Sequence, residues 1–168
     1  MEPVSLPLKQ NPLLPVDLNS MSFEQQQQFI DVALTLLAKQ HQPGALLNNP
    51  KATRDFLRLL LRNHLNEVFG CIFLNSQHTV IDSKHLFFGT IDSTSIYPRV
   101  VAQHCLERNA AAVIIYHNHP SGNCEPSQAD QRMTRHLIEA LALLDIRVLD
   151  HIVVGAAKTS SFAELGLI

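Results

Sequence analysis

An apolar run that leads directly into two histidines constrains the fold of this chain more than any other feature. Residues 110–116 read Ala-Ala-Ala-Val-Ile-Ile-Tyr, and this apolar, β-branched composition predicts a buried strand. His117 and His119 follow two residues apart, and side chains at that spacing on an extended chain point to the same side. Residues 120–122, Pro-Ser-Gly, then break the strand and turn the chain. We therefore expect both imidazoles to converge on one point beside a turn.

The residues after the turn complete a set of metal-ligand side chains. Ser127 opens the next helix and Asp130 lies in its first turn, so the carboxylate can return to the point that the histidines face. Two imidazole nitrogens and one carboxylate oxygen are three ligands for a tetrahedral zinc ion, with the fourth position left to water. We therefore predict that His117, His119 and Asp130 bind Zn²⁺ in a catalytic rather than a structural site.

Plainer interpretations fit parts of this segment. Ser127 and Asp130 match a helix-capping pattern, and His-Pro-Ser-Gly matches an ordinary turn. A bare His-x-His is a weak signal, but the combination of strand, turn, serine, aspartate and amphipathic helix favours a metal site. Capping and metal binding are compatible, because a cap would hold the helix of Asp130 in place. Cys124 lies close enough to be a ligand, although a loop thiol is the favoured interpretation.

At these residues the chain resembles a known family. The pattern H-x-H-x7-S-x2-D is similar to the signature of the JAMM (MPN-plus) metalloproteases. The surrounding residues resemble more closely the RadC family of bacterial JAMM-like proteins. The resemblance extends from about Leu61 to the C-terminus, and it rests on residues 109–112, 117–122, 126–127 and 149–155.

The resemblance implies a fold, a reaction and two further site residues. The fold is a three-layer α/β domain with a mixed sheet, related to the cytidine deaminases. The reaction is hydrolysis of an amide or isopeptide bond by a metal-activated water. Glu67, before an apolar strand, corresponds to the general base, and Ser127 to a hydroxyl that stabilises the tetrahedral intermediate. Spacing alone leaves other bases open, namely Glu107, Glu125, Asp150 and Glu164, and leaves Ser127 equally well explained as a helix cap.

Hydrophobic periodicity predicts the order of the elements. Residues 1–20, which include four prolines, are expected to form an extended arm, and residues 1–60 together an N-terminal arm with helices. Residues 61–168 are expected to form the JAMM-like domain. The helices are predicted at 22–40, 50–63, 97–108 and 127–144, and the strands at 68–74, from 79, at 86–90, 110–116, 146–154 and 161–162.

Charge and cysteine content narrow the choice of partners. The net charge is −2 and no Lys/Arg cluster is present, which argues against nucleic acid as a partner without excluding a local basic patch. Residues 1–60 also lack the glycine-containing helix-hairpin-helix signature of many RadC-like proteins. Three widely spaced cysteines and the lack of a signal peptide or long apolar run predict a cytoplasmic protein outside the membrane.

Together these observations predict that the protein is a zinc metallopeptidase that acts on a peptide or protein substrate. The alternative is a RadC-like, non-catalytic zinc-binding interaction module associated with DNA repair. A deaminase is disfavoured because the chain has no H-x-E…P-C-x-x-C pattern. The sequence does not determine the oligomeric state.

Overall fold

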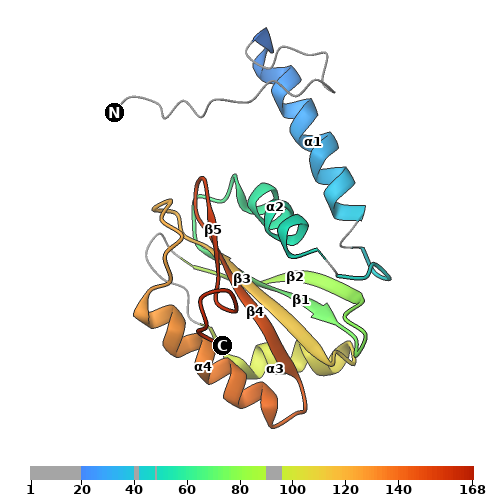
Figure 1. Ribbon diagram of the computed structural model, residues 1–168, viewed down its shortest axis with the longest axis vertical. Helices are drawn as coiled ribbons and strands as arrows, with labels where there is room; N and C mark the ends of the chain where they lie inside the picture. The colour runs from blue at the N-terminus through green and yellow to red at the C-terminus, as the bar shows by residue number, and fades with distance from the viewer. Residues whose placement is uncertain (1–19, 40–41, 48, 90–95) are drawn as a thin grey trace.

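The computed structural model describes residues 20–39, 42–47, 49–89 and 96–168 (Figure 1). The expected arm at 1–20 therefore lies almost entirely outside the described residues. The elements, in chain order, are α1 (Phe23–Lys39), α2 (Pro50–Leu61), β1 (Val68–Leu74), β2 (Val80–Phe88), α3 (Pro98–Glu107), β3 (Ala112–Asn118), α4 (Gln128–Ala142), β4 (Arg147–Val154) and β5 (Thr159–Ser161).

The strands form one mixed sheet in the order β2-β1-β3-β4-β5. All neighbouring pairs are antiparallel except β3 and β4, which are parallel. A parallel pair needs a crossover connection, and α4 supplies it. The mixed α/β architecture predicted from the sequence is confirmed.

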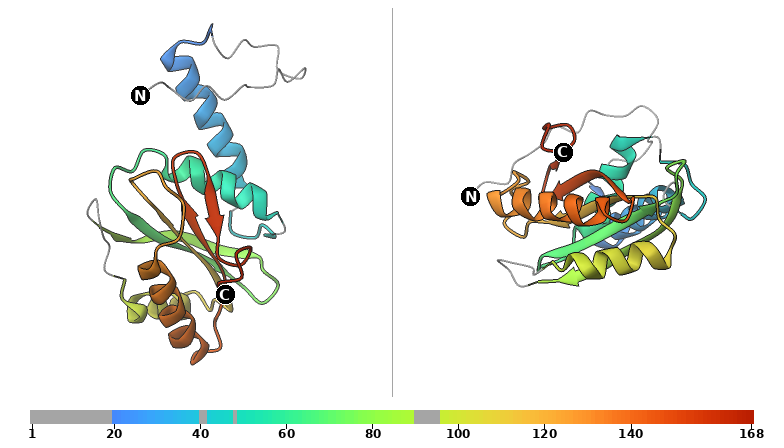
Figure 2. Two further views of the ribbon diagram at one scale, coloured as in Figure 1. Left: turned by 60° about the vertical axis from the view of Figure 1, so that its left-hand side comes forward. Right: turned by 90° about the horizontal axis from the view of Figure 1, so that it is seen from below.

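Helices cover both faces of the sheet (Figures 1 and 2). Successive residues of a strand point to opposite faces, and the buried strand β3 divides its side chains accordingly. Ile114 and Tyr116 pack in the core beneath α2, whereas Val113 and Ile115 pack against α3 and α4. His117 is the next residue on the α4 side, so the strand itself directs the first histidine toward α4.

The two N-terminal helices contribute differently to the core. α2 begins after Asn49, whose side chain accepts a hydrogen bond from the Ala52 N–H, and it buries Phe56, Leu57 and Leu61 against the sheet. α1 packs on α2 and buries no residue completely. The described helices include none that is both long and apolar enough to cross a membrane.

The strand prediction was wrong at one place. The separate strands expected from residue 79 and at 86–90 are a single strand, β2, which runs through the polar residues 82–85. β2 is an edge strand whose side chains are mostly only half-buried, so polar residues cost little there. Residue 90, expected at the end of the second strand, lies outside the described residues.

Gly70 creates the space that Tyr116 occupies between α2 and the sheet. The two residues face each other across β1 and β3, and a Cβ added at Gly70 would overlap the Tyr116 ring. Tyr116 is completely buried, so its ring has little room to move aside.

We expect Gly70→Ala to lower the free energy of unfolding by about 1–3 kcal/mol, the usual cost of overpacking a core. Denaturant unfolding measures this loss. In a Tyr116→Ala background the same substitution should cost much less, because the ring is gone. An equal cost in both backgrounds would show that the ring contact is not the cause.

Candidate metal centre

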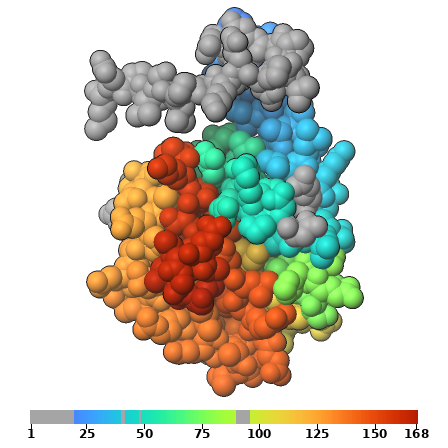
Figure 3. Space-filling model, viewed as in Figure 1, coloured from blue at the N-terminus to red at the C-terminus, as the bar shows by residue number. Residues whose placement is uncertain are grey.

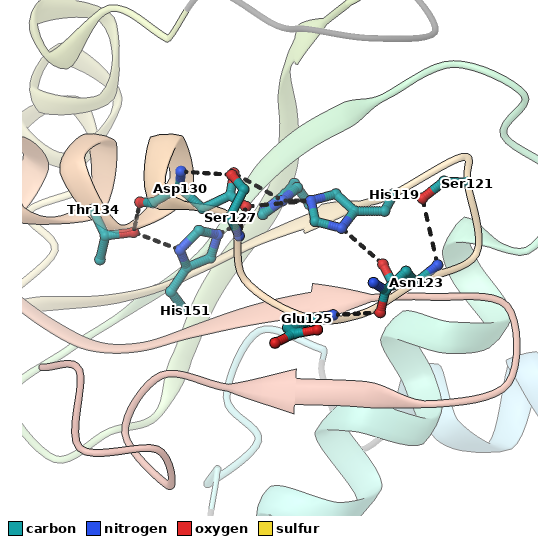
Figure 4. A network of polar contacts seen from close by, with 9 residues as sticks. His119, Ser121, Asn123, Glu125, Ser127, Asp130, Thr134 and His151 are labelled. Atoms are coloured by element: carbon teal, nitrogen blue, oxygen red, sulfur yellow. Dashed lines mark hydrogen bonds and ion pairs between the residues drawn. The ribbon is translucent and has the colours of Figure 1, made fainter.

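Three elements bring the predicted ligands together at one end of the sheet (Figure 4). His117 lies in β3, near its end, and is almost completely buried. His119 follows the strand, and its backbone N–H donates to the Val154 carbonyl at the end of β4. Asp130 is the third residue of α4, in its first turn. The parallel pairing of β3 and β4 thus places the loop after β3 beside the start of α4.

The donor atoms have the spacing that a single metal ion requires. His117 Nε2 and His119 Nε2 are 2.8 Å apart. Asp130 Oδ1 lies 3.4 Å from His117 Nε2, and Asp130 Oδ2 lies 3.4 Å from His119 Nε2. Ligand atoms bound to tetrahedral zinc at about 2.1 Å lie roughly 3.4 Å apart. These three residues can hold a metal ion, and their two imidazoles and one carboxylate fit a metal that prefers nitrogen and oxygen ligands.

Asp130 is oriented by the capping interaction that the sequence suggested. The Ser127 hydroxyl accepts a hydrogen bond from the Asp130 N–H at 3.1 Å, and Asp130 Oδ2 accepts one from the Ser127 N–H at 2.7 Å. This reciprocal capping box supports the start of α4. The role of Ser127 as a helix cap is confirmed, and its hydroxyl proton remains available to a second partner because the oxygen only accepts in the cap.

Two glycines allow the loop after β3 to close around His119. Gly122 has a positive φ of 83°, a conformation that favours glycine. A Cβ on Gly155 would lie 2.5 Å from the Gly122 carbonyl oxygen and 2.9 Å from the Cys124 nitrogen. Cys124 is a free, partly exposed cysteine in this loop and is not part of the three-residue donor group.

Burial and charge set the protonation of the site. Burial lowers the pKa of His117 to about 4, although the Asp130 charge opposes this. Burial acts to raise the pKa of Asp130, but its hydrogen bond with His119 and the nearby His117 hold that pKa well below its usual range. His117 is therefore neutral and Asp130 ionised at neutral pH. These are the forms in which an imidazole and a carboxyl group bind a metal.

His151, which was not among the predicted site residues, touches the first ligand. It lies in β4, is completely buried, and its Nε2 is 2.7 Å from His117 Nδ1. Its Nδ1 is 2.7 Å from the Thr134 hydroxyl on α4 (Figure 4). A histidine followed by three apolar residues, Ile152, Val153 and Val154, was the available sequence signal. The pairing of β4 with β3 was needed to place it behind His117.

The structure separates the five candidate bases. Glu107 lies on α3 beside His104 and Arg108, and Glu164 pairs with Arg54 of α2. Asp150 accepts hydrogen bonds from the Ser161 hydroxyl and from two backbone N–H groups, beside a cavity on the α2 side of the sheet. Of the remaining two, Glu67 is close enough to the ligands for its charge to act on His119. Glu125 lies in the loop between β3 and α4.

Asn118, between the two histidines, holds the backbone on both sides of Glu67. Its Oδ1 accepts from the Val68 N–H at 2.8 Å, and its Nδ2 donates to the Asn66 carbonyl at 3.1 Å. The Glu67 carbonyl accepts a further bond from the Gly89 N–H at 2.8 Å. The three-residue His-Asn-His segment therefore presents two ligands and also anchors the segment of Glu67. The sequence analysis gave Asn118 no such role.

A pocket of about 220 Å³ opens beside His119. It lies between the end of α2, the loop after β3 and the end of β4. Its lining is Arg58, Leu61, Arg62, His64, Asn118, His119, Pro120, Gly122, Val154, Gly155 and Ala156. This set contains two arginines and neither aspartate nor glutamate, so the charged side chains of the lining are positive.

Comparison with known proteins agrees with this site. Residues 47–167 match the family of RadC-like JAB domains. A "UPF0758 protein" of Pseudoalteromonas atlantica is 51% identical over 151 residues, which cover 90% of this chain and 67% of that protein. Another from Thiobacillus denitrificans is 53% identical over 140 residues, covering 83% and 62%. The chain thus spans about two thirds of the length of these relatives.

This chain belongs to the RadC-like JAB domain family. The match covers most of the chain and begins at residue 47, so it includes α2. The resemblance that the sequence motifs suggested is therefore confirmed. The names of the relatives state no activity.

We expect the purified chain to hold about one divalent metal ion, since one set of three ligands is present. His119→Ala should lose most of this metal because only two ligands remain. His136→Ala, an exposed histidine of α4, is the matched control and should keep it. Elemental analysis after dialysis measures the content, and equal metal in both variants would contradict the assignment.

Proposed function

We propose that this chain is a zinc-dependent hydrolase, a metallopeptidase that cleaves an amide or isopeptide bond with a metal-activated water. The position of Glu67 relative to His119 carries the proposal. A ligand set by itself is compatible with a non-catalytic zinc module. A carboxylate held beside the ligands, but outside the donor group, is what hydrolysis requires in addition.

The sheet register supports this position of Glu67. β1 and β3 are antiparallel, with Phe69 opposite His117. In an antiparallel pair, two residues back from Phe69 correspond to two residues forward from His117. This register, continued past the paired residues, brings Glu67 opposite His119. Residues two apart share a face, and Glu67 therefore lies on the ligand side of the sheet. After the larger effect of the hydrogen bond with Asp130, the Glu67 charge helps to raise the pKa of His119.

The residues of the site divide the work of hydrolysis between them. Zinc, when bound by His117, His119 and Asp130, supplies a Lewis acid that lowers the pKa of water and polarises a carbonyl. Glu67 accepts the proton of the attacking water and later gives it to the leaving amine. The Ser127 hydroxyl donates to the oxygen on which negative charge develops.

The substrate chain is expected in the pocket beside His119. A peptide placed there would run past Arg58 and Arg62 of α2, which are 42% and 24% exposed at their side chains. Within the described part of the chain the ion pairs of these arginines are long, 3.7 Å from Arg58 to Asp55 and 3.9 Å from Arg62 to Asp31, and Arg62 also donates to the Leu59 carbonyl. Both guanidinium groups can therefore turn toward a carboxylate of a substrate.

We expect Glu67→Gln to keep the zinc and to lose hydrolysis, since glutamine has nearly the same size but cannot accept a proton from water. The loss of a general base lowers kcat by about 100- to 10,000-fold. Glu125→Gln, an exposed residue of the neighbouring loop, is the matched control and should retain activity. Turnover of a peptide-library substrate and zinc content are measured on both variants.

The reverse result would exchange their roles. If Glu67→Gln kept near-native turnover while Glu125→Gln lost it, Glu125 would be the base. If the zinc-loaded wild type hydrolysed no member of the peptide library, the non-catalytic zinc module would replace the hydrolase. Tight DNA binding at physiological salt would favour the DNA-repair form of that alternative.

We further expect acidic peptides to be preferred substrates. The double variant Arg58→Gln/Arg62→Gln should reduce kcat/KM for them by about tenfold, because two partly exposed ion pairs contribute up to about 1 kcal/mol each. Neutral peptides should be affected little. Arg147→Gln removes a charge at the opposite end of β4 from Val154 and is the control. An equal effect on acidic and neutral peptides would contradict a charge-based preference.

A further inference from the structure

We propose that His151 and Thr134 are positioning residues that hold His117 in the ring tautomer required for metal binding. The inference rests on the metal site of the proposed function and goes beyond it, because neither residue is a ligand. Neutral imidazole has one N–H and one lone pair. A histidine binds metal through Nε2 only when its proton is on Nδ1.

The tautomer of His119 is determined directly by the backbone. Its Nδ1 lies 2.8 Å from the Asn123 carbonyl oxygen, and a carbonyl can only accept. His119 must therefore carry a proton on Nδ1, and in the neutral ring that binds metal its Nε2 lone pair faces the other ligands. His117 has no such carbonyl at its Nδ1. Its partner there is Nε2 of His151, which can either donate or accept.

Thr134 removes this ambiguity. Its hydroxyl oxygen lies 2.6 Å from the Asp130 carbonyl oxygen and 2.7 Å from His151 Nδ1. A hydroxyl has one proton, and the carbonyl has none to share. The proton must go to the Asp130 carbonyl, so that the Thr134 oxygen accepts from Nδ1–H of His151.

The remaining steps follow in order along the buried chain of contacts. His151 has its proton on Nδ1, so its Nε2 accepts. His117 must then donate from Nδ1, and its Nε2 lone pair faces His119 and Asp130. In the opposite arrangement every proton is reversed, and His117 would direct an Nε2–H at His119 Nε2, 2.8 Å away, and at Asp130 Oδ1, 3.4 Å away. That arrangement blocks the metal and leaves two oxygens facing each other at Thr134.

Burial prevents water from forming the hydrogen bonds that the alternative arrangement lacks. Thr134, His117 and His151 are all at most 1% exposed, so each polar atom depends on its protein partner. The anchor of the chain is Asp130 itself. Its carboxylate belongs to the donor group, and its backbone carbonyl, one helical turn before Thr134, receives the Thr134 proton. The carboxylate of the donor group and the carbonyl that accepts the Thr134 hydrogen bond belong to the same residue and therefore move together.

The first test removes the hydroxyl and keeps the shape. Thr134→Val should weaken zinc affinity by about 10- to 100-fold, the usual effect of losing a partner behind a ligand. Thr134→Ser keeps the hydroxyl and should bind zinc within a few-fold of wild type. Competition with a chelator of known affinity measures both. If serine lost as much as valine, packing rather than the hydroxyl would be responsible, and the proposal would be wrong.

The second test observes the tautomer directly in the metal-free chain. Long-range ¹H–¹⁵N NMR spectra distinguish Nδ1–H from Nε2–H for each histidine. We expect Nδ1–H for His117 in wild type and in Thr134→Ser, and a shift toward Nε2–H in Thr134→Val. His119 serves as the internal control, because the Asn123 carbonyl should keep its tautomer in all three. An Nε2–H His117 in wild type would overturn the proposal.

A second variant covers the case in which Thr134→Val does not fold. His151→Leu removes the acceptor behind His117 and keeps an apolar side chain beside Phe162, whose ring centre is 4.5 Å from that of His151. It should weaken zinc binding by a similar factor, and unchanged affinity would contradict the relay. Neither readout needs a substrate. A failure of the hydrolase proposal, with zinc binding intact, therefore leaves this test unaffected.

Discussion

The pairing of β3 with a strand on each side is the constraint on which the rest of the site depends. Its antiparallel register with β1 pairs Phe69 with His117, two residues after Glu67, and its parallel register with β4 brings His151 behind His117. Three consecutive residues, two at the end of β3 and one directly after it, therefore have two tasks. His117 and His119 supply nitrogen atoms of a group that could hold a metal ion, and Asn118 between them anchors the segment of Glu67.

Asp130 couples the helix to this strand. Its side chain completes the donor group and the capping box, while its carbonyl accepts the Thr134 hydroxyl. The position of α4 and the geometry of the donor atoms are thus not independent, and a change at the start of the helix would also move the Asp130 carboxylate. The space-filling view shows the C-terminal segment beside α2 (Figure 3), where Arg54 and Glu164 form an ion pair. This contact includes none of the three donor residues, which come from β3, the residue after it and α4.

Most helices and strands could be read from local pattern, because buried strands and amphipathic helices have distinct periods. β2 could not be predicted as one strand, since an edge strand needs less apolar surface. Its polar middle resembles a turn between two shorter strands. The three ligands were predictable because the chain places them within fourteen residues, in an order that a strand, a turn and a helix convert into proximity. Glu67 was suggested mainly through resemblance, and only weakly by the cost of burying a carboxylate before an apolar strand, since no local pattern connects residue 67 to residue 119.

The sequence by itself determined the family, the mixed α/β fold and the group of His117, His119 and Asp130, because local motifs encode all three. Only the tertiary structure decided how the five candidate carboxylates are distributed over the fold, what Asn118 holds and what His151 touches. The physical reason is that these contacts cross between strands and helices. Register and burial determine such contacts, and neither can be obtained from the spacing of residues along the chain.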